Sequence, residues 1–406
     1  MTETSKQEKP KNPDLEQLED GRLVLNMGPS HPAMHGIVRL LLTVEGERVV
    51  ASDIEIGYLH RGFEKTCENI TYNQCVPYTD RLNYVSPFIN NVGYTLAVEK
   101  LMGIETTPRC QYIRVIMSEL SRLTDHLTCI GANAMELAAF TVYFYLINAR
   151  EEIYRLTDSA AGSRVTPAYT RVGGLTRDLP EDFRRNTQEV FKKVRKNIAD
   201  ADKLLTRNRI FYDRLHGTGS ITREDAISLS FTGPALRSTG VPLDVRKATP
   251  YLVYDRFDFD IPVGSNGDNY DRYLVRMEEI KQSMRIVEQA LAQLPDGPIN
   301  HPDFNVSLPP KKEVYNNIEA LMAHFKLTFE GVKPPKGEVY QAVEGGNGEV
   351  GFYIVSDGTG TPWRVRVRPP CFSLTGGLSR MIQGGYIADI ISTFGQINMI
   401  GGELER

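Results

Sequence analysis

The sequence has few cysteines, and they do not pair at metal-binding spacing. Its 406 residues include Cys67, Cys75, Cys110, Cys129 and Cys371, and no two of them form a CxxC pair. Structural zinc sites and all-cysteine iron–sulfur clusters need several thiolates at close spacing, so the sequence argues against both within this chain. The odd number of cysteines and the lack of an apolar signal segment predict a reduced, cytoplasmic setting.

Long apolar segments and blocks of basic charge are also missing. The longest apolar stretch, Leu137–Ile147, is shorter than the roughly 20 apolar residues of a bilayer-spanning helix. The 47 Lys and Arg residues are balanced by 51 Asp and Glu residues, and no basic block is long enough for a nucleic-acid-binding face. We therefore expect a chain that is soluble by itself, binds no nucleic acid and reaches a membrane only through partners.

Composition and hydrophobic spacing divide the chain into four parts. The N-terminal residues are polar, rich in Lys, Glu and Pro, and have too few apolar side chains to bury a core. The predicted parts are a disordered tail (1–20), a β region that contains a shaped loop (21–64), a helical core domain (65–330), and a C-terminal β-sheet and helix region (331–406).

Apolar spacing predicts an α+β fold, mainly a helical bundle with small antiparallel sheets in the N-terminal and C-terminal parts. Predicted strands begin at Leu23–Leu25 and continue in a hairpin of Val38–Val44 and Val49–Ile56, with further strands within Gly337–Arg368. Predicted helices include the stripe from Ile113 to Leu127, then Asn133–Thr157, Leu179–Leu215, Asp271–Leu294 and Leu378–Phe394.

Two histidines lie four residues apart in the loop Gly28–Gly36. A helical His-x3-His pair would suit a metal, but Pro32 between His31 and His35 argues against a helix. Two readings stay open. The histidines hydrogen-bond to backbone in a tight loop, or one of them presents a proton donor whose ordinary pKa of about 6.5 suits neutral pH.

Other polar residues also have a structural and a functional interpretation. A lone tyrosine such as Tyr84 usually fills a core or an interface, although its phenol is a good hydrogen-bond donor. Arg81 fits a helix-surface ion pair with Asp80 or Glu64. Glu136 precedes an apolar run. It is either a solvated carboxylate at the start of a helix or a buried carboxylate that needs a partner.

Two charged segments are interpreted as structural. Asp271, Arg272, Arg276 and Glu279 recur at helical spacing, which predicts a helix linked by ion pairs that is structural or interfacial and not catalytic. The run Trp363–Arg368 alternates basic and apolar residues. We expect its arginines to pair with carboxylates at a contact between subunits, and binding of phosphate or acidic lipid is the alternative.

Four runs occur in a characteristic order: Gly28–Gly36, His60–Lys65, Pro77–Tyr84 and Gly267–Tyr273. Together they resemble the hydrogenase-derived D subunit (49-kDa type) of respiratory complex I, the NADH:quinone oxidoreductase. The resemblance covers the chain from about Leu23 to the end. It implies a nickel–iron hydrogenase large-subunit-like fold and an enzyme subunit that binds no redox cofactor or metal of its own. Such a protein holds a quinone beside a neighbour's cluster.

The resemblance also implies roles for four candidate residues. His35 and Tyr84 match the family's residues at the quinone head-group and are the implied catalytic pair. His31 and Glu136 match positions that support this site, although the family usually has Asp where this chain has Glu136. Two-electron reduction of a quinone needs two protons, so two protic side chains are the minimum machinery.

Arg81 and Thr166 match positions near the partner's terminal iron–sulfur cluster. Many family members have histidine in place of Thr166, and a threonine does not titrate near neutrality. The resemblance therefore implies menaquinone as the quinone. Asn83 and Ser86 stand where nickel–iron hydrogenases carry a metal-binding cysteine pair, so the hydrogenase chemistry is lost.

The implied partners are the B-, C- and I-type iron–sulfur subunits and the membrane-arm H-type subunit. Iron–sulfur clusters, FMN and NADH would then be bound by partners, at the cytoplasmic face of a bacterial inner membrane. Three alternatives stay open. The first is a homologous complex with deazaflavin (F420H2) or ferredoxin as electron donor. The second is a relative of the energy-converting hydrogenases, which the missing cysteine pairs argue against. The third is a structural scaffold, in which mutation of Tyr84 has no effect on activity.

Overall fold

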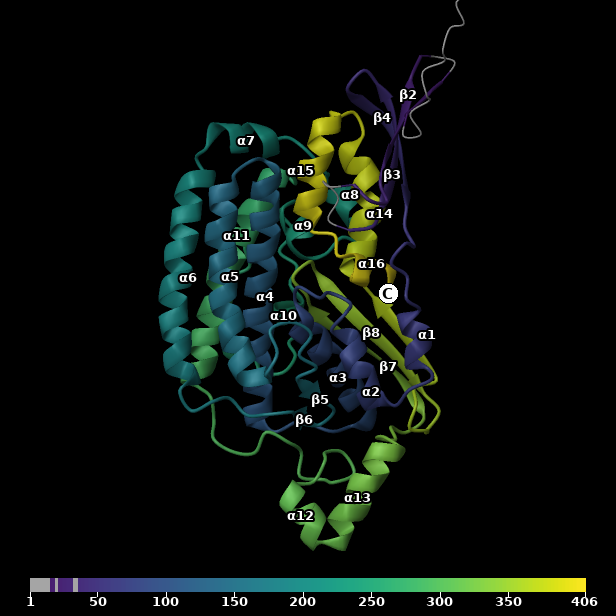
Figure 1. Ribbon diagram of the computed structural model, residues 1–406, viewed down its shortest axis with the longest axis vertical. Helices are drawn as coiled ribbons and strands as arrows, with labels where there is room; N and C mark the ends of the chain where they lie inside the picture. The colour runs from purple at the N-terminus through teal and green to yellow at the C-terminus, as the bar shows by residue number, and fades with distance from the viewer. Residues whose placement is uncertain (1–14, 19–20, 32–35) are drawn as a thin grey trace, which may run out of the picture.

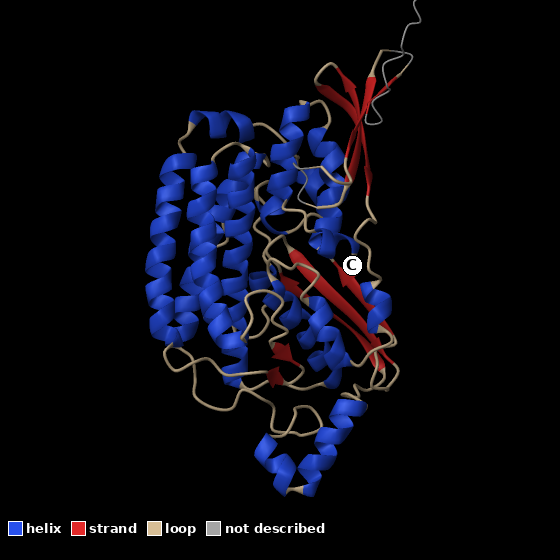
Figure 2. Ribbon diagram, viewed as in Figure 1, coloured by secondary structure: helices blue, strands red, loops and turns tan. Residues whose placement is uncertain are grey.

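The structure is a computed structural model that describes residues 15–18, 21–31 and 36–406. Long helices form most of it, and three small antiparallel sheets are added to them (Figures 1 and 2). The predicted α+β class is confirmed. Within the described residues, no helix is long and apolar enough to span a bilayer.

The strands of the described part form the sheets β1-β2-β3-β4, β5-β6 and β7-β8-β9. They are β1 (Leu15–Gln17), β2 (Leu23–Met27), β3 (Arg39–Glu45), β4 (Arg48–Glu55), β5 (Thr170–Arg171), β6 (Gly174–Leu175), β7 (Gly337–Glu344), β8 (Glu349–Ser356) and β9 (Arg364–Arg368). The predicted N-terminal hairpin and the predicted strands within Gly337–Arg368 are therefore present. The first strand lies within the range predicted to be a disordered tail.

The helices fall into long ones that form the bundle and short ones that connect them. They are α1 (Phe63–Cys67), α2 (Tyr72–Thr79), α3 (Pro87–Met102), α4 (Pro108–Glu136), α5 (Phe140–Ala161), α6 (Phe183–Leu205), α7 (Arg209–Leu215), α8 (Arg223–Ser228), α9 (Gly233–Arg237), α10 (Val245–Ala248), the 3-10 helix η1 (Tyr254–Arg256), α11 (Asn269–Ala292), α12 (Lys311–Asn316), α13 (Ile318–Phe329), α14 (Pro370–Ile382), α15 (Ile387–Ile397) and α16 (Gly401–Glu405).

Helix α4 is the centre of the bundle, where it stands beside α5 and α11 (Figure 1). It begins at Thr107, whose hydroxyl accepts a hydrogen bond from the backbone N–H of Cys110 at 3.4 Å, and Pro108 occupies the first turn. The apolar stripe from Ile113 to Leu127 is buried, and so are charged residues on its other faces. Those charges need partners inside the molecule.

Two hydrophobic cores hold the fold together, and each draws on distant parts of the sequence. The larger core joins α3, α4, α5, α6 and α11 to the sheet β7-β8-β9. The smaller core joins the sheet β2-β3-β4 to α14, α15 and α16. The N-terminal strands and the C-terminal helices are therefore packed against each other (Figure 1). Because each core combines residues from several of the predicted domains, the cores do not test the predicted domain boundaries, which remain predictions.

Three predicted helices are wrong in their bounds, because each one contains a break. The first spans the end of α4 and the start of α5, which are separated near Ala138 at φ 65°. The second splits before α7, where Asn208 caps the new helix by accepting from the N–H of Phe211. The third splits between α14 and α15 at Gly384, whose φ of 79° is left-handed backbone that favours glycine.

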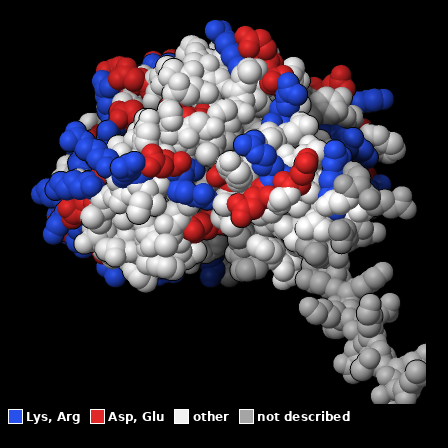
Figure 3. Space-filling model, turned by 90° about the horizontal axis from the view of Figure 1, so that it is seen from above, with Lys and Arg blue, Asp and Glu red and all other residues white. Residues whose placement is uncertain are grey.

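Charges of both signs interleave on one face of the molecule. Seen from above (Figure 3), Lys and Arg side chains alternate with Asp and Glu side chains on the visible face. This distribution agrees with the net charge of −4.

Candidate functional site

Tyr84 lies on a tight turn between α2 and α3. The carboxamide oxygen of Asn83 accepts the backbone N–H groups of Val85 at 3.1 Å and Ser86 at 3.2 Å, and this fixes the turn. The Tyr84 side chain is 38% exposed, and its hydroxyl makes no hydrogen bond to the described residues. A phenol in that position is available to a ligand.

Two side chains act electrostatically on Tyr84. Partial burial raises the pKa of Tyr84, Cys371 raises this pKa further, and the Arg61 guanidinium lowers it. The net shift is upward, so the phenol keeps its proton at neutral pH and is a hydrogen-bond donor.

The two residues at the predicted former cysteine positions face a buried carboxylate. Asp125 of α4 accepts hydrogen bonds from the side chains of Asn83 at 3.0 Å, Ser86 at 2.8 Å and Asn398 at 2.8 Å. All four residues are buried. The three neutral donors together reach both oxygens of this buried carboxyl group.

The same cluster continues toward the C-terminal segment. The side chains of Asn398 and Asn347 are joined at 2.6 Å, and the Cys371 thiol accepts a hydrogen bond from the Asn347 amide at 3.5 Å. We call Asn83, Ser86, Asp125, Asn347, Cys371, Asn398 and Glu403 the buried polar cluster. In the described part of the chain, no three His, Cys, Asp or Glu side chains converge as a metal-ligand set.

The last residues are clamped to the segment that follows β4. The backbone N–H of Leu59 donates to the carboxylate of Glu405, and Nδ1 of His60 lies 2.6 Å from the Glu405 carbonyl oxygen. The Arg61 guanidinium donates to the carbonyl oxygens of Arg81 at 2.7 Å and Gly402 at 3.3 Å. The segment 59–61 and the C-terminal helix α16, which are far apart in the sequence, are thereby joined next to the Tyr84 turn.

Arg81 makes the predicted ion pair with Asp80, at 3.6 Å, and its side chain is 47% exposed. Burial raises the pKa of Asp80 to about 6, although hydrogen bonds from Asn91 and the backbone N–H of Ala168 act in the opposite direction. The hydrogen bond from the Ala168 N–H to the Asp80 carboxylate is 2.8 Å long. It places the loop that contains Thr166 next to Asp80, the neighbour of Arg81 in the sequence. Thr166 itself has left-handed backbone at φ 53°.

The other predicted site residues lie apart from the Tyr84 turn or outside the described residues. Glu136 is the last residue of α4 and not a helix start, and it lies against α15, where a Cβ on Gly395 would approach its carboxylate to 2.7 Å. His31 is partly buried in the loop between β2 and β3. His35 lies outside the described residues. The far end of its loop, Gly36, packs against Met399.

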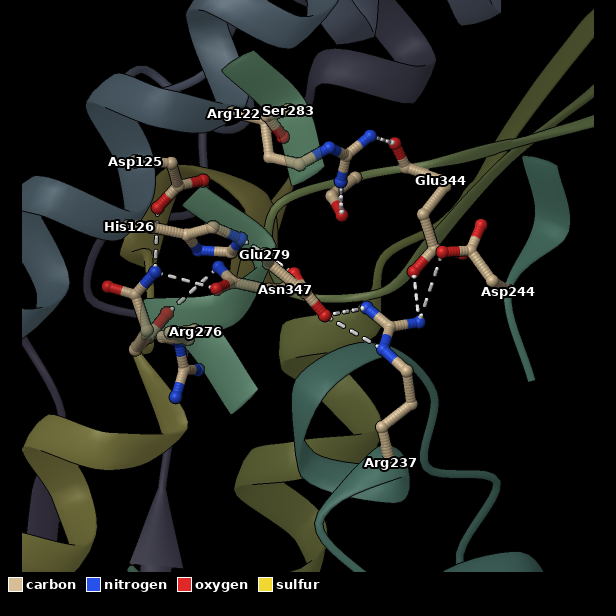
Figure 4. A network of polar contacts seen from close by, with 12 residues as sticks. Arg122, Asp125, His126, Arg237, Asp244, Arg276, Glu279, Ser283, Glu344 and Asn347 are labelled. Carbon is tan, nitrogen blue, oxygen red and sulfur yellow. Dashed lines mark hydrogen bonds and ion pairs between the residues drawn. The ribbon is translucent and has the colours of Figure 1, made fainter. Parts of the chain in front are cut away.

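A second polar network lies beside the buried polar cluster, one residue further along α4 (Figure 4). Nε2 of His126 is 2.7 Å from the Glu279 carboxylate, and Glu279 also pairs with Arg237 at 2.6 Å. Arg237 reaches Glu344 of β7 at 2.8 Å. Glu279 therefore pairs with residues of α4 and α9 and not, as predicted, with a neighbour on its own helix.

Burial and charge act in opposite directions in this network. Burial opposes the charge of Glu279, but Arg237 and His126 outweigh it and hold the pKa of Glu279 far below its usual range. Burial lowers the pKa of His126, so its imidazole is neutral at pH 7. The network continues through Asp244, Arg246, Glu119 and Arg122, all buried.

Two arginines of β9 pair with carboxylates, as predicted, and these carboxylates belong to the same chain. Arg364 lies 3.1 Å from Glu68, and Arg366 lies 2.9 Å from Glu64. Both carboxylates are on or next to α1, which covers the edge of the sheet.

Sequence reasoning did not predict Asp125, Asn347, Cys371, Asn398 or Glu403 as site residues. Only Asp125 has a local signal, because it is a charged residue in the apolar stretch of α4. Asn347 and Glu403 follow glycines, Cys371 is in the first turn of α14, and Asn398 caps the end of α15, so only the fold brings them together.

Comparison with known proteins agrees with this arrangement. Residues 136–406 match the family described as respiratory-chain NADH dehydrogenase, 49 Kd subunit. The D 1 subunit of NADH-quinone oxidoreductase from Sorangium cellulosum is 56% identical over 385 residues, which is 95% of each chain. The corresponding D subunit of Myxococcus xanthus is 53% identical over all of both chains.

A third relative carries two subunits in one chain. The fused C/D subunit of NADH-quinone oxidoreductase from Bdellovibrio bacteriovorus is 49% identical over 389 residues, 96% of this chain and 70% of the relative. The family match begins at residue 136, after the Tyr84 turn, whereas the Myxococcus xanthus relative is matched along the whole chain. Such subunits act together with other subunits of one enzyme complex. The chain therefore belongs to the 49 kDa, or D, subunit family of the respiratory-chain NADH dehydrogenase, complex I.

Proposed function

We propose that this chain forms the quinone-reducing site of a proton-translocating NADH:quinone oxidoreductase. The Tyr84 phenol, exposed on a fixed turn with an unoccupied donor, is the observation that carries the proposal. Tyr84 donates to one quinone carbonyl oxygen, and His35 on the 28–36 loop serves the other. The Gly36 end of that loop packs beside the buried polar cluster, which supports this pairing.

The reaction adds two electrons and two protons to the quinone and forms a quinol. Electrons come from the terminal iron–sulfur cluster of a neighbouring subunit. The O–H bond of Tyr84 supplies one proton to one quinone oxygen, and an N–H bond of His35 supplies the second proton to the other oxygen. The half-exposed Arg81, held by Asp80, offers a positive charge to the partner's cluster and favours its reduced form. His31 and Glu136 support the loop and α15 around the site.

The setting of this site is part of the proposal. The neighbours are the B-, C- and I-type subunits and the membrane-arm H-type subunit, which hold the iron–sulfur clusters, FMN and NADH. The chain itself binds no cofactor and is held at the cytoplasmic face of the inner membrane by these partners. Thr166 in place of a titratable histidine supports menaquinone as the quinone.

Tyr84→Phe tests the proposal because it removes one hydroxyl and little volume. Membranes with this variant should lose electron flow from NADH to quinone by about 100-fold, the scale of a general acid, and keep the flow to an artificial acceptor that bypasses the site. The matched control is Tyr315→Phe, on the 77% exposed tyrosine of α12, which should change neither rate.

Other outcomes point to other readings. Unchanged quinone reduction in Tyr84→Phe would contradict the proposal and favour a scaffold. Membranes that oxidise no NADH before mutation, but oxidise deazaflavin or ferredoxin, would move the site to a homologous complex with that donor. The relatives' names support NADH.

A further inference from the structure

Helix α6 carries basic side chains on the outer flank of the bundle (Figure 1). Its apolar residues between Phe183 and Leu205 recur at helical spacing and are buried in the larger core. From residue 184 to residue 196 the exposed side holds six Lys or Arg residues and one glutamate, in a chain whose net charge is −4. We call the six cations the basic stripe, and they are Arg184, Arg185, Lys192, Lys193, Arg195 and Lys196.

Only part of the basic stripe is neutralised by this chain. Three of its cations form ion pairs, namely Arg185 with Asp182, Lys193 with Glu152 and Arg195 with Glu288. Arg184, Lys192 and Lys196 make no ion pair with any residue that the structure describes. Lys192 and Lys196 are four residues apart, and like charges at that spacing destabilise a helix. Such an arrangement fits a surface whose acidic counterpart lies on another molecule.

An apolar hollow of about 1010 Å³ opens between α6, α11 and the loop before α11. Ala199 of α6, Leu274 of α11 and Val263 of the loop are among its lining residues. Val263 is 48% exposed and Leu274 is 38% exposed, so the lining is open to solvent. Covering apolar surface removes it from water, which favours binding of an apolar group in the hollow.

The hollow and the unpaired lysines share one side of α6. Arg195 borders the hollow, Lys192 lies one helical turn before it, and Ala199 lies one turn after it. Lys196 follows Lys192 by one turn on the same side. A ligand that places an apolar group in the hollow therefore has two unpaired cations within reach.

The shape of this surface favours a polypeptide over a lipid. From Arg184 to Lys196 the helix rises about 18 Å, at 1.5 Å per residue, a distance that about six extended residues cover. Cations spread over that length need several carboxylates, whereas one lipid phosphate is a single anionic group. The apolar face of α6 is buried in the core and has nothing to insert into a bilayer. The chain also belongs to a family of subunits of one complex, so other polypeptides surround it.

We propose that the basic stripe and the adjoining hollow bind an acidic segment of another subunit. Asp or Glu side chains of that segment pair with Arg184, Lys192 and Lys196, and an apolar side chain enters the hollow. The surface lies on α6 and α11 and not on the Tyr84 turn. The inference therefore does not depend on the proposed quinone site.

Zero-length cross-linking of the intact, purified complex tests this inference. A carbodiimide condenses a lysine amine with a carboxyl group into an amide, with loss of one water, only where the two groups are in contact. We expect mass spectrometry to find Lys192 or Lys196 joined to Asp or Glu of another polypeptide. Cross-links that stay within this chain, with both lysines acetylated as fast as in the urea-unfolded chain, would overturn the inference.

Two double variants separate charge from cross-linking chemistry. Lys192→Glu with Lys196→Glu should weaken binding of the cross-linked subunit by about tenfold or more, measured as its release from the complex with rising salt. Lys192→Arg with Lys196→Arg is the matched control, because it keeps the charge and should keep the subunit while losing the cross-link. Equal retention of the subunit in both double variants would contradict the proposal.

A third variant tests the hollow without changing any charge. Ala199→Trp places a bulky side chain at an exposed position and fills the hollow, so the subunit should again be released at lower salt. Release at the wild-type salt concentration would show that the hollow is not part of the interface. If Lys192 and Lys196 are protected from acetylation only after vesicles of phosphatidylglycerol are added, the ligand is a lipid and the inference is wrong.

Discussion

At the residue scale, three buried carboxyl groups differ because their neighbours differ. Asp125 has three neutral donors, Glu279 has an arginine and a histidine, and Glu403 has no hydrogen bond within the described part. Residue type alone would treat Glu279 and Glu403 alike. Their environments hold the pKa of Glu279 far below its usual range and raise the pKa of Glu403 to about 8.

Glu403→Gln should change stability in a pH-dependent way. The folded chain holds the Glu403 proton up to about pH 8, whereas an unfolded glutamate loses it near pH 4.3. Wild-type stability attributable to this group is therefore lost as pH rises between these values, and the glutamine variant avoids the loss. Hydrogen exchange of this chain's peptides in the purified complex measures this difference. The stability of the variant relative to wild type should increase from about pH 5 to about pH 8. A constant difference would contradict the prediction.

Thr166→His should make the partner cluster's potential depend on pH. The wild-type residue does not titrate near neutrality, so the potential should stay flat between about pH 6 and about pH 8. Histidine tolerates the left-handed backbone at φ 53° better than most residues, so the loop should hold. Potentiometric titration followed by electron paramagnetic resonance should give a slope of up to about 59 mV per pH unit in the variant. Thr166→Ser is the control and should stay flat.

At the element scale, α14 carries adjacent glycines with opposite surroundings. A Cβ on Gly377 would approach the ring of Phe231 to 2.4 Å, whereas a Cβ on Gly376 meets nothing within 4 Å. The first glycine is needed for the contact between α14 and the α8–α9 segment. The second only lowers helix propensity.

Gly377→Ala and Gly376→Ala should therefore have opposite signs. Overpacking against Phe231 should cost about 1–3 kcal/mol, while alanine at the exposed position should gain up to about 1 kcal/mol. Thermal unfolding or hydrogen exchange of the α14 peptides in the purified complex separates the two. Equal effects would mean that the packing of α14 does not depend on this close approach.

At the scale of the whole molecule, the buried ion network joins elements that belong to different parts of the chain. Arg237 of α9 lies between Glu279 of the bundle and Glu344 of the sheet (Figure 4). Its removal leaves two carboxylates uncompensated in the interior.

Arg237→Met should destabilise the fold by about 3–5 kcal/mol, because an unpaired buried charge is more costly than a missing pair. The double variant Arg237→Met with Glu344→Gln should recover part of this loss. Urea unfolding of the purified chain, or hydrogen exchange within the complex, measures both. A single variant as stable as wild type would show that water enters the network.

The sequence by itself determined the class of fold and the family, and it indicated Tyr84 as a candidate site residue. Those features follow from apolar periodicity and from short contiguous motifs, which local spacing preserves. The tertiary structure decided the rest. Glu403 lies more than 300 residues from Asn83 in the chain, yet both belong to the buried polar cluster. Whether a carboxyl group there is charged depends on burial and donors supplied by α4, α14 and the loops, and no local pattern encodes these.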